Sequence, residues 1–148
     1  MWLQMKNNNQ LFYTCSLIEY IGRLQKRKRS DVVIQMGKEV LMRIFNHADV
    51  LHCEPIEKVA EEFILMCKID KGNYDNISQS KYNIPDYWTI GEVYERLIED
   101  IRGKDIIEAL MLVYNSWISE AISNYNSDFY YQSREYIYQC FRDGEIIQ

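Results

Sequence analysis

His47, His52, Cys53 and Glu54 form the one close grouping of residue types that bind metals or transfer protons, and the chain has no other histidine. The two histidines are five residues apart, a spacing that turns them away from each other on one helix and differs from that of helical zinc motifs. We therefore expect no catalytic residues, no metal and no cofactor. An enzyme that uses His47, His52 and Glu54 is kept as the weakest of three hypotheses.

Other catalytic patterns are missing from the sequence. There is no Gly-x-Ser-x-Gly turn, no phosphate-binding glycine loop and no Cys-x-x-Cys pair. The four cysteines are scattered singly, which is typical of reduced thiols in a cytoplasmic protein. No apolar run approaches the roughly 18 residues that span a bilayer, so we expect no membrane association. These absences direct attention to binding surfaces.

A basic cluster near residue 26 is the strongest nucleic-acid signal. Residues 1–50 carry a net charge of +4 and residues 51–148 a net charge of −9. Clustered Lys and Arg side chains supply the sequence-independent attraction to phosphates. The candidate residues for nucleic-acid binding are Arg23, Lys26, Arg27, Lys28 and Arg29. The alternative interpretation is that these cations oppose the negative end of a helix dipole.

Tyrosine is abundant, with twelve residues in 148. Aromatic side chains are favoured both in cores and at the centres of protein interfaces, so core packing and a partner or homo-oligomer interface both stay open. Aromatic residues are most frequent, together with polar neighbours, in two segments, one near residue 80 and one near residue 135. The candidate partner-binding residues are Tyr74, Asp75, Asn76, Tyr87, Trp88, Tyr130, Tyr131 and Tyr138.

The spacing of apolar residues predicts an all-α fold: one domain, residues 1–148, with about six helices and one long ordered loop. Only two prolines and six glycines interrupt the chain. Ser30 and Asp31 are expected to cap the second helix, Thr89 the fourth, and Asp128 the sixth, while the fifth is expected to be the buried centre. The predicted helices cover residues 10–28, 31–46, 55–66, 90–101, 104–124 and 128–142, and the loop covers residues 68–88.

The segments 48–60, 74–76 and 84–91 resemble a family of small uncharacterised proteins of low-GC Gram-positive bacteria. The resemblance covers about residues 16–101. It implies membership of a small operon with toxin-like or mobile-element genes, and hence an antitoxin-like or accessory role. It implies no activity and no catalytic residues.

The leading hypothesis is therefore a non-enzymatic protein–protein interaction module, antitoxin-like or accessory to a bacterial operon. The alternative is a nucleic-acid-binding protein that uses the basic cluster at residues 23–29.

Overall fold

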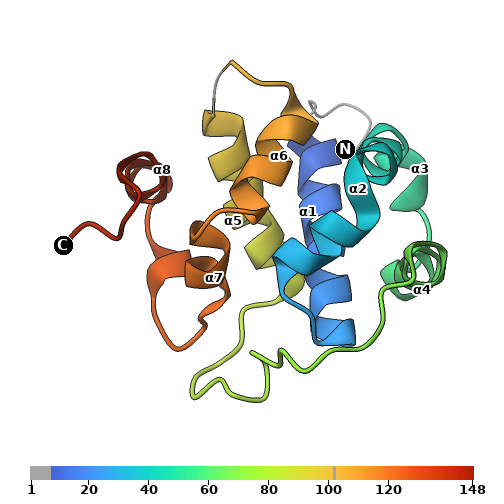
Figure 1. The fold of residues 1–148 in the computed structure, drawn as a ribbon, viewed down its shortest axis with the longest axis horizontal. Coiled ribbons are helices and arrows are strands. Elements are labelled where there is room, and N and C mark those ends of the chain that lie inside the picture. The colour runs from blue at the N-terminus through green and yellow to red at the C-terminus, as the bar shows by residue number, and fades with distance from the viewer. Residues whose placement is uncertain (1–7, 102) are drawn as a thin grey trace.

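The computed structural model describes residues 8–101 and 103–148 and shows an all-α fold, as predicted (Figure 1). In these residues there are eight α-helices, one 3-10 helix and no strand. No helix among them is long and apolar enough to cross a bilayer. The elements are α1 (Asn8–Gln25), α2 (Arg29–Asn46), α3 (Ala48–Leu51), α4 (Ile56–Cys67), α5 (Tyr87–Asp100), α6 (Ile106–Tyr114), α7 (Ile118–Ser123), the 3-10 helix η2 (Phe129–Tyr131) and α8 (Arg134–Asp143).

Helix α1 is the centre of the fold, with α5 and α6 on one side and α2, α3 and α4 on the other (Figure 1). All seven residues from Tyr13 to Glu19 are buried, and the most extensive helix contact in the fold joins α1 to α5. The expectation of a central helix over residues 104–124 is wrong. That segment forms α6 and α7, because the Ser116 hydroxyl donates to the Val113 carbonyl and accepts from the Ile118 N–H, which diverts the backbone from the helical ladder.

Three helix starts differ from the prediction, two of them because another side chain caps the helix. Helix α5 begins at Tyr87, where Asp86 accepts the Thr89 N–H, so Thr89 is a donor to the cap and not the cap itself. Helix α8 begins at Arg134, where Ser133 accepts the Tyr136 N–H. Asp128 instead precedes η2. Helix α2 begins at Arg29, with Ser30 and Asp31 inside its first turn.

The loop between α4 and α5 covers the C-terminal end of α1 (Figure 1). Helix α1 ends at Gln25, three residues earlier than predicted, because Lys26 takes a left-handed conformation with φ of 53°. Gly72 N–H donates to the Gln25 carbonyl and Tyr74 N–H to the Lys26 carbonyl, at 2.8 and 2.9 Å. These bonds satisfy carbonyls that a helix end leaves unpaired. The loop is thus ordered, as predicted, and helps to terminate α1.

Gly91 sets the distance between α5 and α1. A Cβ at this position lies 2.9 Å from the Ser16 nitrogen and 3.0 Å from its Cα. We expect Gly91→Ala to lower the free energy of unfolding by about 1–3 kcal/mol through overpacking, although Ala favours helix more than Gly does. Urea unfolding measures this. Glu92→Ala, at the exposed neighbouring position, is the control and is expected to change it by less than about 0.5 kcal/mol. An unchanged value for Gly91→Ala would contradict the close packing.

Candidate protein-interaction surface

The basic cluster divides into a buried part and an exposed part. Arg29 is 1% exposed and donates to both carboxylate oxygens of Glu19, at 2.9 and 3.0 Å. Arg23 donates to the same carboxylate at 2.8 Å, and the Tyr125 hydroxyl also donates to it. Burial by itself would raise the pKa of Glu19, but the two arginines lower it to about 2. Arg23 and Arg29 therefore hold the core together and do not present free charge.

The other three cations of the cluster lie at the turn between α1 and α2, each engaged with a different part of the chain. Lys26 pairs with Asp75 at 3.7 Å and Lys28 with Glu120 at 3.6 Å. Arg27 donates to the Asp70 carbonyl at 2.7 Å. The five residues do not form one basic face, so this end of the molecule offers phosphate much less charge than the sequence indicates.

The histidine segment, residues 47–54, lines none of the cavities that lie beside the loop, α5 or the segment 125–131. His47 is exposed and its Nδ1 lies 2.9 Å from the Arg43 carbonyl, while Glu54 pairs with Lys58 at 2.7 Å. Cys53 Sγ lies 3.8 Å from His52 Nε2. Across residues 8–101 and 103–148, no group of three or more His, Cys, Asp and Glu side chains could hold a metal ion. His47 and Glu54 are thus engaged with Arg43 and Lys58 and not with each other.

Five of the eight candidate partner-binding residues lie in the loop or at the start of α5, where they contact other segments of the chain. Asn76 accepts from Arg29 at 3.1 Å and donates to the Ser123 carbonyl at 2.9 Å, which joins the loop to the buried pair and to α7. The Tyr74 ring lies 6.0 Å from the Arg29 guanidinium, and Asp75 accepts the Ser78 N–H.

The aromatic pair at the start of α5 packs against α1. The Tyr87 ring lies 5.1 Å from the Tyr20 ring, and the Trp88 ring lies 5.5 Å from the Phe12 ring. Both Tyr87 and Trp88 are half-buried. Their contacts join α5 to α1, so they stabilise the fold and leave only part of their surface to a partner.

The remaining three candidates differ in exposure. Tyr131 is 83% exposed, the highest value among the large apolar and aromatic side chains of residues 8–101 and 103–148. Tyr130 is half-buried, with its ring edge-to-face against both Tyr125 and Tyr131. Tyr138 is half-buried on α8, 6.0 Å from the Arg142 guanidinium. We call η2, residues 129–131, the aromatic turn.

Local hydrogen bonds hold the aromatic turn in place. The Ser127 hydroxyl accepts the Phe129 N–H at 3.2 Å, and the Asp128 carbonyl accepts the Tyr131 N–H at 3.0 Å. The Phe129 ring is buried beside Trp117 and Tyr136. Because Phe129 points inward, the next two tyrosines of the tight turn point elsewhere, and Tyr131 is directed to the surface.

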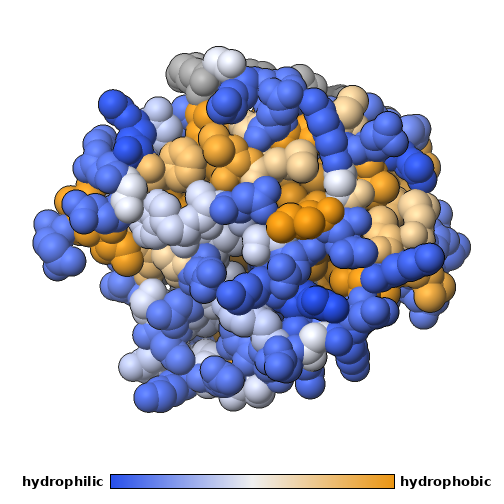
Figure 2. Space-filling model, viewed as in Figure 1, coloured by the Kyte–Doolittle hydropathy of each residue, from blue (hydrophilic) through white to orange (hydrophobic). Residues whose placement is uncertain are grey.

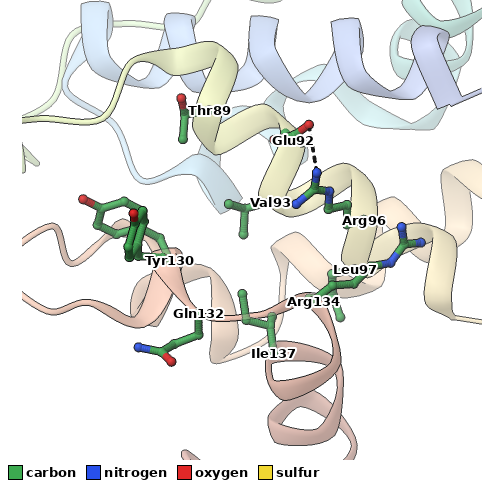
Figure 3. A pocket seen from close by; sticks show the side chains of 10 residues that line it. Thr89, Glu92, Val93, Arg96, Leu97, Tyr130, Gln132, Arg134 and Ile137 are labelled. Carbon is green, nitrogen blue, oxygen red and sulfur yellow. Dashed lines mark ion pairs between the residues drawn. The ribbon is translucent and has the colours of Figure 1, made fainter.

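Two cavities meet at the aromatic turn. The first, of about 220 Å³, is lined by Tyr130 and Tyr131 on one side and by α5 on the other, where Glu92 pairs with Arg96 at 3.1 Å (Figure 3). The second, of about 590 Å³, also contains Tyr130 and Tyr131 and is completed by Tyr82, Tyr125 and residues 126–128. Tyr131 thus forms a ridge with a groove on each side.

A carboxyl pair lies in a further cavity of about 390 Å³ that shares Glu92, Arg96 and Arg134 with the first. Glu95 is 8% exposed and faces Glu99 on the same helix. Burial, a hydrogen bond that the protonated Glu95 donates to Glu99, and the charge of Glu99 raise the pKa of Glu95 to about 8. Arg134 pairs with Glu99 and Asp100 at 3.1 and 2.9 Å. Glu95 is therefore mostly protonated at neutral pH.

Sequence reasoning missed three residues that matter here. Tyr82 is 68% exposed and completes the large groove, but its surroundings in the loop carried no periodic signal. The sequence predicts Asp128 as a helix cap, but this residue lines that groove. Glu19 interrupts the apolar face of α1, a signal that could have indicated a buried ion pair.

In comparisons with protein-family models, with curated proteins and with solved structures, the chain matches none. The resemblance to a bacterial small-protein family therefore stays a prediction, and function is inferred from the surface of the chain itself.

Proposed function

We propose that this protein is a non-enzymatic protein–protein interaction module that binds its partner through the aromatic turn and the grooves beside it. The observation that supports this is the exposure of Tyr131 between two cavities that share it. Tyrosine supplies a large contact area with little loss of side-chain freedom, and it is enriched among the residues that dominate binding energy. An antitoxin-like or accessory cytoplasmic component of a small bacterial operon is consistent with this role.

Nucleic-acid binding remains the alternative, with less support. It would depend on Lys26, Arg27 and Lys28, since Arg23 and Arg29 are engaged with Glu19. Those three side chains are dispersed by their contacts with the loop and α7.

We expect Tyr131→Ala to weaken binding of the partner by about 30-fold, because a central aromatic anchor contributes about 2 kcal/mol or more. The measurement is the yield of a stoichiometric partner that copurifies with the tagged protein from its own cells. The protein should keep its stability, because the Tyr131 side chain is already exposed in the free chain.

Leu65→Ala is the matched control, since Leu65 is an exposed apolar residue of α4, on the other side of α1 (Figure 1). It should retain the partner at the wild-type level. Equal retention by Tyr131→Ala would reject the aromatic turn as the binding surface. A wild-type chain that is monomeric and recovers no partner would reject the interaction role itself.

A further inference from the structure

The surface beside the aromatic turn extends beyond its two cavities. A polar cavity of about 330 Å³ between the loop and α7 shares Tyr125 and Asn126 with the large aromatic cavity. The aromatic cavity in turn shares Tyr130 and Tyr131 with the cavity against α5. The three cavities therefore lie in a row, polar at the loop end, aromatic in the middle and mixed at the α5 end, with the Tyr131 ridge between the last two, and we call this row the groove. On the face shown in Figure 2, the surface over the loop is mostly hydrophilic.

The charge of this groove is negative at its centre. Asp128 is the one charged residue that lines the aromatic cavity, and its carboxylate makes no ion pair with any residue that the structure describes. The polar cavity adds Asp75 and Glu120, whose partners Lys26 and Lys28 are at the long distances of 3.7 and 3.6 Å. At the α5 end, Arg96 is already paired with Glu92, and Arg134 with Glu99 and Asp100.

Tyrosine rings and a carboxylate favour the same kind of ligand. The face of an aromatic ring attracts a cation through its quadrupole, and an unpaired carboxylate attracts it through its charge. The chain shows this preference internally, where the Arg23 guanidinium lies 5.3 Å from the Tyr125 ring centre. A lysine or arginine side chain is therefore the group that best complements the aromatic cavity.

We propose, on the basis of the proposed function, that the occupant of this groove is an extended, cationic segment of a partner protein, with a lysine or arginine held between Tyr82, Tyr131 and Asp128. An extended chain presents side chains at about 3.3 Å intervals on alternate sides, which suits a groove whose character changes along its length. An amphipathic helix needs one continuous apolar groove, and the polar cavity at the loop end does not continue the apolar surface. A nucleic-acid backbone would bring phosphates to Asp128 and be repelled.

Selection from a random dodecapeptide library displayed on phage tests this inference. Twelve extended residues span about 40 Å. Wild type is expected to enrich peptides with a net positive charge and at least one lysine or arginine beside an aromatic or apolar residue. The matched protein Tyr131→Ala/Asp128→Asn should enrich none of them. No enrichment by the wild type, or enrichment of neutral or acidic peptides, would overturn the proposal.

Fluorescence anisotropy with the most enriched peptide then measures how much the Asp128 carboxylate and the peptide lysine each contribute to binding. We expect Asp128→Asn to weaken binding five- to tenfold, and replacement of the peptide lysine by norleucine to weaken it similarly. Raising the salt concentration from 50 to 300 mM should weaken it further. A single-stranded oligonucleotide that competes with the peptide, or sedimentation showing that a second copy of the chain occupies the groove, would reject the cationic partner segment.

The two proposals fail differently. If no cationic peptide binds but the cellular partner is still lost on Tyr131→Ala, the interaction role stands and the chemistry assigned to the partner is wrong. If the partner is retained by Tyr131→Ala, the surface itself is wrong.

Discussion

Replacing Glu19 with Gln is expected to lower the free energy of unfolding by about 3–5 kcal/mol, because it leaves the buried Arg29 guanidinium without its counter-charge. Arg29 and Glu19 are almost fully buried and share two hydrogen bonds, and Arg23 and Tyr125 donate to the same carboxylate. Urea unfolding at pH 7 measures the loss. Because the pKa of Glu19 is lowered in the folded state, the stability that it contributes is present above about pH 4.5 and is lost as the pH falls towards 2.

Glu120→Gln is the control for this experiment, since it removes an exposed ion pair with Lys28 and should cost less than about 0.5 kcal/mol. The double variant Glu19→Gln/Arg29→Met should be less unstable than the sum of its single variants, because it removes both buried charges. Additive losses would show that Glu19 and Arg29 do not act as a pair. A small loss for Glu19→Gln would show that the carboxylate is not needed to neutralise Arg29.

The apolar spacing was sufficient to predict the helices, but the ends depended on contacts with other segments. Helix α1 ends at Gln25, where the Gln25 and Lys26 carbonyls accept from the N–H groups of Gly72 and Tyr74 in the loop. The Gln25 side-chain Nε2 also donates to the loop, at the Ile69 carbonyl 44 residues further along. The break between α6 and α7 depends on one hydroxyl, that of Ser116. Periodicity does not register such bonds, because it describes which faces are apolar and not which polar groups find a partner.

The candidate surface was predicted only in part for the same reason. The sequence indicated that tyrosines exceed what one core contact can cover, and Tyr131 is indeed exposed. It did not indicate that Tyr87 and Trp88 are used to join α5 to α1. Nor did it show that Tyr82, 49 residues before Tyr131, completes the same cavity. The exposure of a side chain depends on its tertiary neighbours, and the amino-acid sequence does not show which distant segments pack together.

The basic cluster at residues 23–29 is the clearest case in which the sequence alone did not indicate which side chains are exposed. Five cations within seven residues indicate a charged face, yet Arg29 lies in the core because Glu19 is there to neutralise it. A buried carboxylate on an otherwise apolar helix face requires a cation nearby. Glu19 therefore indicated that one cation of the cluster is buried, which the run of Lys and Arg residues did not indicate.

Glu95 is expected to make the protein less stable in mild alkali. Its pKa is raised to about 8 in the folded state, so the folded chain holds a proton that the unfolded chain releases above about pH 4.5. The free energy of unfolding should therefore fall as the pH rises from 5 to 8 and level off above about 8, with a loss of about 3 kcal/mol from this group. Glu95→Gln keeps the uncharged form at every pH. Urea unfolding at pH 5 and pH 9 should show the variant close to wild type at pH 5 and about 3 kcal/mol more stable at pH 9.

Glu92→Gln is the control on the same helix, because Glu92 is exposed and pairs with Arg96. Its effect should be below about 0.5 kcal/mol at both pH values. Parallel pH profiles for wild type and Glu95→Gln would show that Glu95 is ionised in the folded protein at neutral pH. If the difference instead appears only at pH 9, the cavity between α1, α5 and α8 contains a neutral carboxyl beside the charged Glu99. The cavity that adjoins the α5 end of the groove then becomes more negative as the pH rises, and a cationic segment that reaches this end should bind more tightly at pH 9 than at pH 6.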